Sequence, residues 1–410
     1  MNKKITIIGA NYAPEDTAIG LYTTQLAEYL VSQGFEVTVL SGFPYYPAWK
    51  IAPSYIGKPT FYKETIRGVQ VYRYKQYVPE NPSFIKRILL LTDYTLGAFR
   101  NLFKIKETDL VLAIVPFTTA ILLGRILAKR KKAKLWIHIQ DFEFDAASES
   151  NLLQSNNKKN LFFTLLFKIE SYLLQKSDAA STISHAMLRK LADKTNPQLP
   201  KYLLPNWVNT DTINPDKARV HPFLQSDKFK ILYSGNIGAK QNWVLFIQLV
   251  TAFQQDTTVE FVVVGDGAGK KELVDKLAHS DNVTFYKPVP YEDLSNLLCS
   301  ADLHVLFQKE DVIDTVMPSK ILGMMASAKP SIITGNSQSE VQDVMAQSKA
   351  GYYFSSDAID SIKQAVIDLK ENPDMAKEMG VNARSYVSEH FSSTPVLAQF
   401  ADKFKAILSV

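Results

Sequence analysis

A glycine-bearing loop in the second half of the chain has the residues to hold a phosphate group. Lys240 follows the apolar run "FKILYSG", beyond Gly235, Asn236 and Gly238. Glycine lets a backbone approach a ligand closely, and a lysine past the end of a strand can hold a phosphate as a point charge. For a single match of this kind, a turn with an exposed lysine is the better explanation.

A second loop of this type occurs in "VEFVVVGDGAGKKEL", where Gly265, Asp266 and Gly267 separate an apolar strand from a helix. The first N–H groups of a helix are free and carry the positive end of its dipole, so they attract anions. This match is also weak when it is taken alone.

The third loop is "FQKEDVIDTVMPSKILGMMASAKPSII", in which Pro318 fits the first turn of a helix and precedes Ser319 and Lys320. The N-terminus of that helix could seat a diphosphate, and Asp314 could accept hydrogen bonds from sugar hydroxyls. A capped helix with core methionines is the alternative. Together the three loops predict a diphosphate site more strongly than any one of them.

The first half opens with a strand, Ile5 to Ile8, then Gly9, a polar loop, and Gly20 at the opening of a helix. A dinucleotide fingerprint needs three glycines within six residues, and this loop lacks them. The stretch therefore begins an α/β module that does not bind a dinucleotide.

A run of carboxylates stands in "IHIQDFEFDAA". Asp141, Glu143 and Asp145 would share one face of a strand and could mimic a metal cluster, although a solvated edge is the commoner case. His138 shares the face of Gln140, and a buried histidine with satisfied hydrogen bonds is favoured over a catalytic one.

Strand-like runs recur with helices between them, seven before residue 207 and six after residue 228. We therefore predict an α/β protein with two modules, residues 1–206 and 207–386, and a last helix over 387–410 that packs back on the first. Ligands of open parallel sheets bind beyond the carboxyl ends of the strands. Two such modules that face each other would place the site in a cleft.

Composition describes a soluble protein with 46% hydrophobic and 21% charged residues and a single cysteine, Cys299, which suits a reducing compartment. The longest apolar run, residues 110–124, contains Pro116 and is shorter than the ~20 residues that span a bilayer.

Charge is divided unequally. Residues 1–205 carry 27 basic and 16 acidic side chains, a net charge of +11, whereas the other 205 carry 19 and 25, a net charge of −6. Six cations stand in "RILAKRKKAK", and two aromatic-rich segments with flanking lysines read as amphipathic helices. Core-facing helices with solvated rims are the alternative. The net charge of +11 in the first half favours an anionic membrane surface or a phosphorylated lipid as partner. The negative net charge of the second half does not support binding to nucleic acid.

These loops resemble the C-terminal module of the retaining group 1 glycosyltransferases that use sugar nucleotides and have the GT-B fold. In the first half, "YAPEDTAIGLYTTQLAEYL", "PYYPAW" and "IQDFEFDAA", with "LLPNWVNTD" and "VMPSK" later, are similar to exopolysaccharide glycosyltransferases of the colanic-acid and O-antigen type. The resemblance covers nearly the whole chain. It implies two Rossmann-like parallel-sheet domains that face each other across a cleft.

The resemblance also implies roles for the two modules. The first would receive a polyprenyl-diphosphate-linked or oligosaccharide acceptor, with Asn11, Tyr12, Glu15 and Gln140 on the acceptor side. The Gly9–Gly20 loop would close over the donor, a UDP- or GDP-sugar that the second module holds. The donor-binding residues are then Gly20, Gly235, Asn236, Lys240, Gly265, Asp266, Gly267, Asp314, Pro318, Ser319 and Lys320.

The chain departs from the family at three positions of the second module. Thr315 and Gly323 stand where the family usually has paired glutamates, and Asn236 replaces a basic residue, which leaves Lys240 and Lys320 as the phosphate cations.

For catalysis, the resemblance implies reaction on one face of the sugar without a bound metal or cofactor, with Lys240, Asp141 and Asp314 as catalytic residues. We expect an enzyme of exopolysaccharide, capsule or O-antigen assembly, cytoplasmic and peripheral on the inner face of the cytoplasmic membrane. The alternatives are a GT-B nucleotide-sugar 2-epimerase and a non-catalytic binding subunit.

Overall fold

The computed structural model describes residues 2–15, 18–80, 83–142, 157–311 and 318–409. The chain divides into two compact units: Met1–Pro205 with Leu397–Val410, called unit 1, and Asn206–Val396, called unit 2. The expected boundary, between residues 206 and 207, lies one residue from this division.

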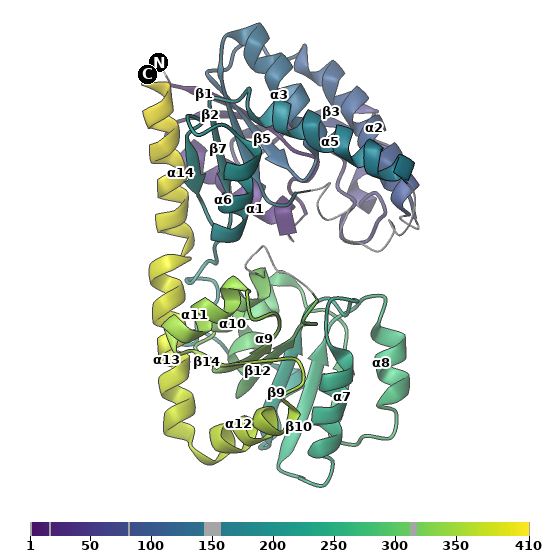
Figure 1. Cartoon of the computed structure of the whole chain (residues 1–410), viewed down its shortest axis with the longest axis vertical. Helices are drawn as coiled ribbons and strands as arrows, with labels where there is room; N and C mark the ends of the chain where they lie inside the picture. The colour runs from purple at the N-terminus through teal and green to yellow at the C-terminus, as the bar shows by residue number, and fades with distance from the viewer. Residues whose placement is uncertain (1, 16–17, 81–82, 143–156, 312–317, 410) are drawn as a thin grey trace. The chain divides into compact units, whose positions relative to one another are not determined.

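Unit 1 is built on an eight-stranded sheet with the order β3-β4-β2-β1-β5-β6-β7-β8 (Figure 1). Every neighbouring pair is parallel except β3 and β4. The strands are β1 (Lys4–Ile8), β2 (Glu36–Gly42), β3 (Phe61–Ile66), β4 (Val69–Tyr74), β5 (Leu110–Val115), β6 (Lys134–Ile139), β7 (Ala179–Thr182) and β8 (Lys201–Leu203). All six residues of β5 are buried, as expected for a parallel strand covered on both faces.

The helices of unit 1 fill the connections between these strands. They are α1 (Ala18–Ser32), α2 (Phe84–Leu102), α3 (Thr118–Lys131), α5 (Asn157–Leu174) and α6 (His185–Lys194), with a 3-10 turn at Pro53–Tyr55. Ser184 begins α6 by accepting a hydrogen bond from Met187 N at 3.0 Å, as an N-cap serine should. In the described part of the chain, no helix combines the length and apolar content needed to cross a membrane.

One strand of unit 1 was not expected. Phe61–Ile66 pairs antiparallel with β4 through a two-residue turn, in which Arg67 has φ +44° and Gly68 has φ +83°. Two positive φ angles are typical of the hairpin turn whose twist matches that of the strands. The first sheet is therefore mixed rather than wholly parallel.

Unit 2 contains a six-stranded, wholly parallel sheet with the order β11-β10-β9-β12-β13-β14. Its strands are β9 (Phe229–Ser234), β10 (Val259–Val264), β11 (Val283–Tyr286), β12 (Leu303–Phe307), β13 (Ser331–Thr334) and β14 (Gly351–Phe354). Its helices are α7 (Trp243–Ala252), α8 (Lys270–Lys276), α9 (Leu294–Cys299), α10 (Ser319–Ala326), α11 (Glu340–Ser348), α12 (Ile359–Glu371) and α13 (Pro373–His390), with 3-10 turns at Pro222–Leu224 and Tyr291–Asp293.

The C-terminal segment differs from the single helix expected over residues 387–410. Helix α13 ends at His390 and α14 (Ser393–Leu408) begins after a break, where Ser392 forms a β-bridge with Val208. In unit 1, Phe400 and Phe404 of α14 pack edge-on against His138 and Trp136 of β6. The helix does return to the first module, but it begins six residues later than expected.

A buried arginine joins the loops of unit 1. Arg73 on β4 is 0% exposed, and its guanidinium pairs with Glu64 and donates to the carbonyl oxygens of Gly42, at 2.8 Å, and Ala13. Its carbon Cζ also lies 5.0 Å from the ring centre of Tyr55. The arginine thus fixes the polar loop after β1 to the ends of β2 and β4.

We expect the change Arg73→Met to destabilise unit 1 by about 3–5 kcal/mol, because it leaves Glu64 and two buried carbonyl groups without their partner. Hydrogen exchange of the β1 and β2 amides measures this loss separately from unit 2. The matched control is Arg67→Met. Arg67 pairs with Glu28 in solvent, so its loss should cost no more than about 1 kcal/mol. Equal effects of the two changes would contradict an anchoring role for Arg73.

Candidate functional site

The loops that follow β9 and β10 touch each other through their glycines. A Cβ atom on Gly265 would lie 2.0 Å from the carbonyl oxygen of Gly235, and one on Gly267 would lie 2.4 Å from that of Ile237. Gly267 also has φ +151°, a conformation that disfavours other residues. Ile237 N donates to Asp266 O at 2.8 Å, which ties the loops together. These glycines are therefore required by contact between loops, whatever ligand the loops hold.

Lys320 crosses directly over the first of these loops. A Cβ atom on Gly235 would lie 2.3 Å from Lys320 Cε, so any other residue there would have to displace the lysine side chain. The Lys320 ammonium donates to Tyr233 Oη at 2.9 Å and Asn236 O at 3.3 Å, and it lies 4.9 Å from the centre of the Tyr233 ring. Among the described residues, it forms no ion pair with a carboxylate. Burial lowers the pKa of Lys320 to about 8.

The same ammonium stands in the first turn of α10. Pro318 is the N-cap of this helix and gives it no side-chain capping bond, and Ser319 is exposed as its first residue. The positive end of the helix dipole thus lies beside a half-buried cation that has no counter-ion among the residues the structure describes. Such an arrangement can bind an anion, and a diphosphate has the charge to satisfy both.

Lys240 and Asp266 are exposed on the same group of loops. Lys240 O accepts from Lys309 N at 3.0 Å, while its ammonium forms no ion pair within the described ranges. The Asp266 carboxylate accepts from Gly267 N at 2.8 Å. Contact of either side chain with a donor stays a prediction.

A third lysine was missed by sequence reasoning. The Lys270 ammonium donates to Gly265 O at 2.7 Å and to Tyr286 O at 3.3 Å, and so supports the second loop from beneath. Its position one residue after Gly269, at the start of α8, was the available signal. Its bonds to backbone carbonyls identify a supporting role that the sequence did not reveal.

The resembled family usually has paired glutamates at the positions of Thr315 and Gly323, and the second of these positions lies inside α10. Gly323 is buried, and a Cβ atom there would lie 3.3 Å from Leu298 and 3.7 Å from Ile213. A glutamate would therefore enter an apolar environment, which is unfavourable for a carboxylate. Asp314 and Thr315 lie outside the described residues.

In unit 1, Glu15 organises the loops at the carboxyl end of the sheet. Its carboxylate accepts 2.8 Å hydrogen bonds from Asn11 Nδ2 and from the backbone N–H groups of Tyr45 and Tyr46. Burial raises the pKa of Glu15, while these three bonds act in the opposite direction. A Cβ atom on Gly20 would lie 2.9 Å from Glu15 Cβ, so the close approach that Gly20 permits is to Glu15 itself.

The other two residues expected on the acceptor side are also buried. Tyr12 is 1% exposed, and the Gln140 amide lies 3.0 Å from His138 Nε2. His138 Nδ1 lies 2.9 Å from Ser181 Oγ, and burial lowers the pKa of His138 to about 3. The prediction of a buried histidine with satisfied hydrogen bonds is therefore confirmed, and its lack of a catalytic role stays a prediction. Tyr12, Glu15 and Gln140 are thus buried within unit 1. Their contact with an acceptor stays a prediction.

The carboxylates after β6 are only partly described. Asp141 is exposed, whereas Glu143 and Asp145 lie outside the described residues. Elsewhere in the described ranges, no three His, Cys, Asp or Glu side chains are grouped as a metal site would require. The expectation that the chain works without a metal stays a prediction.

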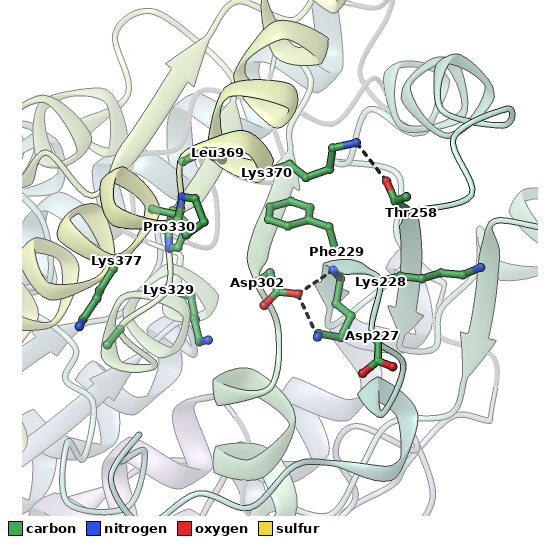
Figure 2. A pocket seen from close by; sticks show the side chains of 14 residues that line it. Asp227, Lys228, Phe229, Thr258, Asp302, Lys329, Pro330, Leu369, Lys370 and Lys377 are labelled. Atoms are coloured by element: carbon green, nitrogen blue, oxygen red, sulfur yellow. Dashed lines mark hydrogen bonds and ion pairs between the residues drawn. The ribbon is translucent and has the colours of Figure 1, made fainter.

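A hollow of about 600 Å³ lies at the amino ends of the unit 2 strands, opposite the end that carries the glycine loops (Figure 2). Two of the lysines that line it are already paired: Lys230 Nζ with Asp302 at 3.1 Å, and Lys370 Nζ with Asp256 at 2.6 Å. Phe229 supplies apolar surface. Because the glycine loops follow the ends of the strands, this hollow is not part of the candidate site.

Two family models together match most of the chain. The glycosyl transferase 4-like domain matches residues 17–207, and glycosyl transferases group 1 matches residues 215–386. The chain is 30% identical over 413 residues to WcaI of Escherichia coli (strain K12), which carries the name of a colanic acid biosynthesis glycosyl transferase. The match covers 98% of this chain and 100% of WcaI.

Solved structures of low sequence identity share the fold. The sucrose-phosphate synthase of Thermosynechococcus elongatus is 15% identical with a TM-score of 0.75, and the match covers 100% of both chains. Anabaena HepE, solved in complex with UDP-glucose, is 13% identical with a TM-score of 0.66, over 98% of this chain and 99% of HepE. The chain therefore belongs to the group 1 glycosyltransferases of GT-B fold, and within them it is of the exopolysaccharide type.

Proposed function

We propose that the chain transfers a sugar from a UDP- or GDP-sugar, with retention of configuration, to a lipid-linked or oligosaccharide acceptor in exopolysaccharide, capsule or O-antigen assembly. Unit 2 would bind the donor and unit 1 the acceptor. The observation that carries the proposal is the Lys320 ammonium, which lies over Gly235 with hydrogen bonds to Tyr233 and Asn236 and no carboxylate partner among the described residues. The complex of HepE with UDP-glucose supports a donor of this chemical class.

The chemistry of transfer explains why such a cation is needed. As the sugar–phosphate bond breaks, negative charge develops on the leaving diphosphate and positive character on the anomeric carbon. Lys320 and the first turn of α10 would stabilise the diphosphate without reorganising, because both are held by the fold. Lys240, exposed on the neighbouring loop, would supply a second charge.

Retention would follow from reaction on a single face of the sugar. An oxygen of the leaving phosphate would accept the proton of the acceptor hydroxyl, while the new glycosidic bond forms and the bond to phosphate breaks. This route needs no enzyme nucleophile of the kind that retaining glycosidases use. Asp314 would bind sugar hydroxyls, and Asp141 would act beside the acceptor.

Family membership favours a transferase over a nucleotide-sugar 2-epimerase or a non-catalytic binding subunit. The positive charge of residues 1–205 supports an acceptor held at an anionic membrane. We therefore propose a cytoplasmic site of action, peripheral on the inner face of the cytoplasmic membrane.

The base of the donor can be found by thermal unfolding with UDP, GDP, ADP and NAD at equal concentration. A ligand present at 100 times its Kd should add about 2.7 kcal/mol to the free energy of unfolding. We expect a rise in Tm with UDP or GDP and none with NAD. A rise in Tm with NAD alone, or no rise with any of the four nucleotides, would contradict the proposed donor.

We expect the affinity for that nucleoside diphosphate to fall as the pH rises through about 8. The pKa of Lys320 is lowered to about 8, so its ammonium is charged below that pH and becomes neutral above it. Lys320→Met should bind about tenfold or more weakly at pH 7, since a charge-assisted hydrogen bond contributes about 1.5–3 kcal/mol. It should also lose the dependence on pH above 7. Calorimetric titration from pH 7 to 9 measures both effects.

Lys240→Met is the matched control for this titration, because it removes one exposed ammonium from the same loops. It should weaken binding and keep the pH dependence of the wild type. If Lys320→Met binds the nucleotide with unchanged affinity, Lys320 does not contact the diphosphate and the donor site has to lie elsewhere.

A further inference from the structure

Exposed apolar side chains of the described chain are concentrated on three helices of unit 1. Of fifteen large hydrophobic residues that are exposed, nine lie on α2 with its C-cap, on α3 or on α5, whereas unit 2 contributes three. The nine are Ile88, Leu89, Leu96, Phe99, Phe103, Leu122, Ile126, Ile169 and Tyr172, and we call this set the α2–α3–α5 face. Monomeric proteins rarely expose a large contiguous apolar surface without a use for it.

On α2 the exposed residues form a stripe. Leu89, Leu96 and Phe103 are spaced by seven residues, which is close to two full turns, and Phe99 stands three residues after Leu96. Residues at these spacings share one side of a helix. The most exposed of them, Leu96, is 67% exposed in the middle of the helix. The stripe is therefore a row of exposed apolar side chains, interrupted by Thr92 and Asp93 between Leu89 and Leu96, that no described part of unit 1 covers.

The stripe continues sideways onto α3 and α5. Thr95 of α2 hydrogen-bonds to Thr119 of α3 at 2.8 Å, and the Arg125 guanidinium of α3 lies 5.1 Å from the ring centre of Tyr172 on α5. Figure 1 shows the three helices gathered together in unit 1. The exposed residues of the three helices thus belong to one surface.

Cations stand directly beside the exposed aromatic rings of this face. Arg130 lies 4.5 Å from the ring centre of Phe103, and Lys176 lies 5.5 Å from that of Tyr172. Helix α3 carries four cations, Arg125, Lys129, Arg130 and Lys131, and no acid.

Acidic side chains on the other two helices are occupied. Asp93 of α2 accepts from Tyr74 Oη and Tyr77 N, at 2.8 and 2.6 Å. Glu170 of α5 is buried against Lys194. The face therefore presents apolar groups together with α3 cations that form no ion pair with a carboxylate of the described residues.

We propose that the α2–α3–α5 face binds an anionic lipid bilayer. The apolar side chains would enter the boundary between headgroups and acyl chains, and the arginines and lysines would reach the lipid phosphates, as on membrane-surface helices. Charge complementarity selects lipid over a second copy of the chain, because two such faces would repel each other. The inference assigns a surface to the membrane acceptor of the proposed function and rests on it, but the surface binds lipid without any donor.

Sedimentation of the full chain with phosphatidylcholine vesicles, with and without phosphatidylglycerol, tests this proposal. We expect binding only when phosphatidylglycerol is present, and weaker binding as salt is added. Leu96→Glu should abolish most binding. Lys129→Glu should weaken it by roughly fivefold or more, because each cation near an anionic surface contributes about 1 kcal/mol.

Two changes on α13 of unit 2 are the matched controls. Val381→Glu replaces a residue that is 53% exposed, and Lys377→Glu reverses an exposed lysine. Both should leave sedimentation unchanged, and all four variants should keep the Tm shift caused by the donor nucleotide. The Tm shift tests the proposed donor and sedimentation tests the lipid-binding face. The two hypotheses are therefore separable, because the shift can be absent while lipid binding remains.

Two results would overturn the proposal. If Leu96→Glu and Val381→Glu reduce vesicle binding equally, the α2–α3–α5 face is not the surface that binds lipid. A dimer in light scattering that Leu96→Glu dissociates, together with no sedimentation on either kind of vesicle, would assign the face to a second copy of the chain.

Discussion

The contact between two glycine loops is the constraint on which the candidate donor site depends. Gly265 and Gly267 press against the backbone of residues 235–237 so closely that a methyl group at either position would overlap a carbonyl oxygen. Gly235 in turn leaves room for the Lys320 side chain to cross the loop. This backbone packing holds the ammonium at the first turn of α10, with a hydroxyl and a carbonyl as partners. Its charge stays available because no described carboxylate neutralises it.

Unit 1 uses charge differently. Arg73 and Glu15 are both buried, and each makes two of its hydrogen bonds to the protein's own backbone. Arg73 donates to the carbonyl groups of Ala13 and Gly42, and Glu15 accepts from the N–H groups of Tyr45 and Tyr46. Buried ion pairs and hydrogen-bonded charges often specify geometry more than they add stability. Here they fix the polar loop after β1 to the loop after β2. Glu15, which was expected on the acceptor side, is therefore also a support of that loop.

The pattern of apolar runs predicted thirteen strands, and each is present as a strand of its sheet. The strand that was missed, β3, is partly exposed at the sheet edge and lacks the continuous apolar run of the parallel strands. The break between α13 and α14 was missed for another reason. Ser392 is held by a bridge to Val208, almost two hundred residues away, and helical periodicity carries no information about such a contact.

The sequence by itself determined the two modules, their strand-ending glycine loops, and the three loops that carry Lys240, Asp266 and Lys320. Those features are local, because they depend on periodicity and on residues a few positions apart. Only the tertiary structure decided which charges are free. A lysine is expected to be exposed from sequence alone, yet Lys320 is half-buried over Gly235 while Lys270 is bound to backbone carbonyls. The physical reason is that burial and pairing depend on neighbours from distant parts of the chain, such as Gly235 and Lys320, which only folding brings together.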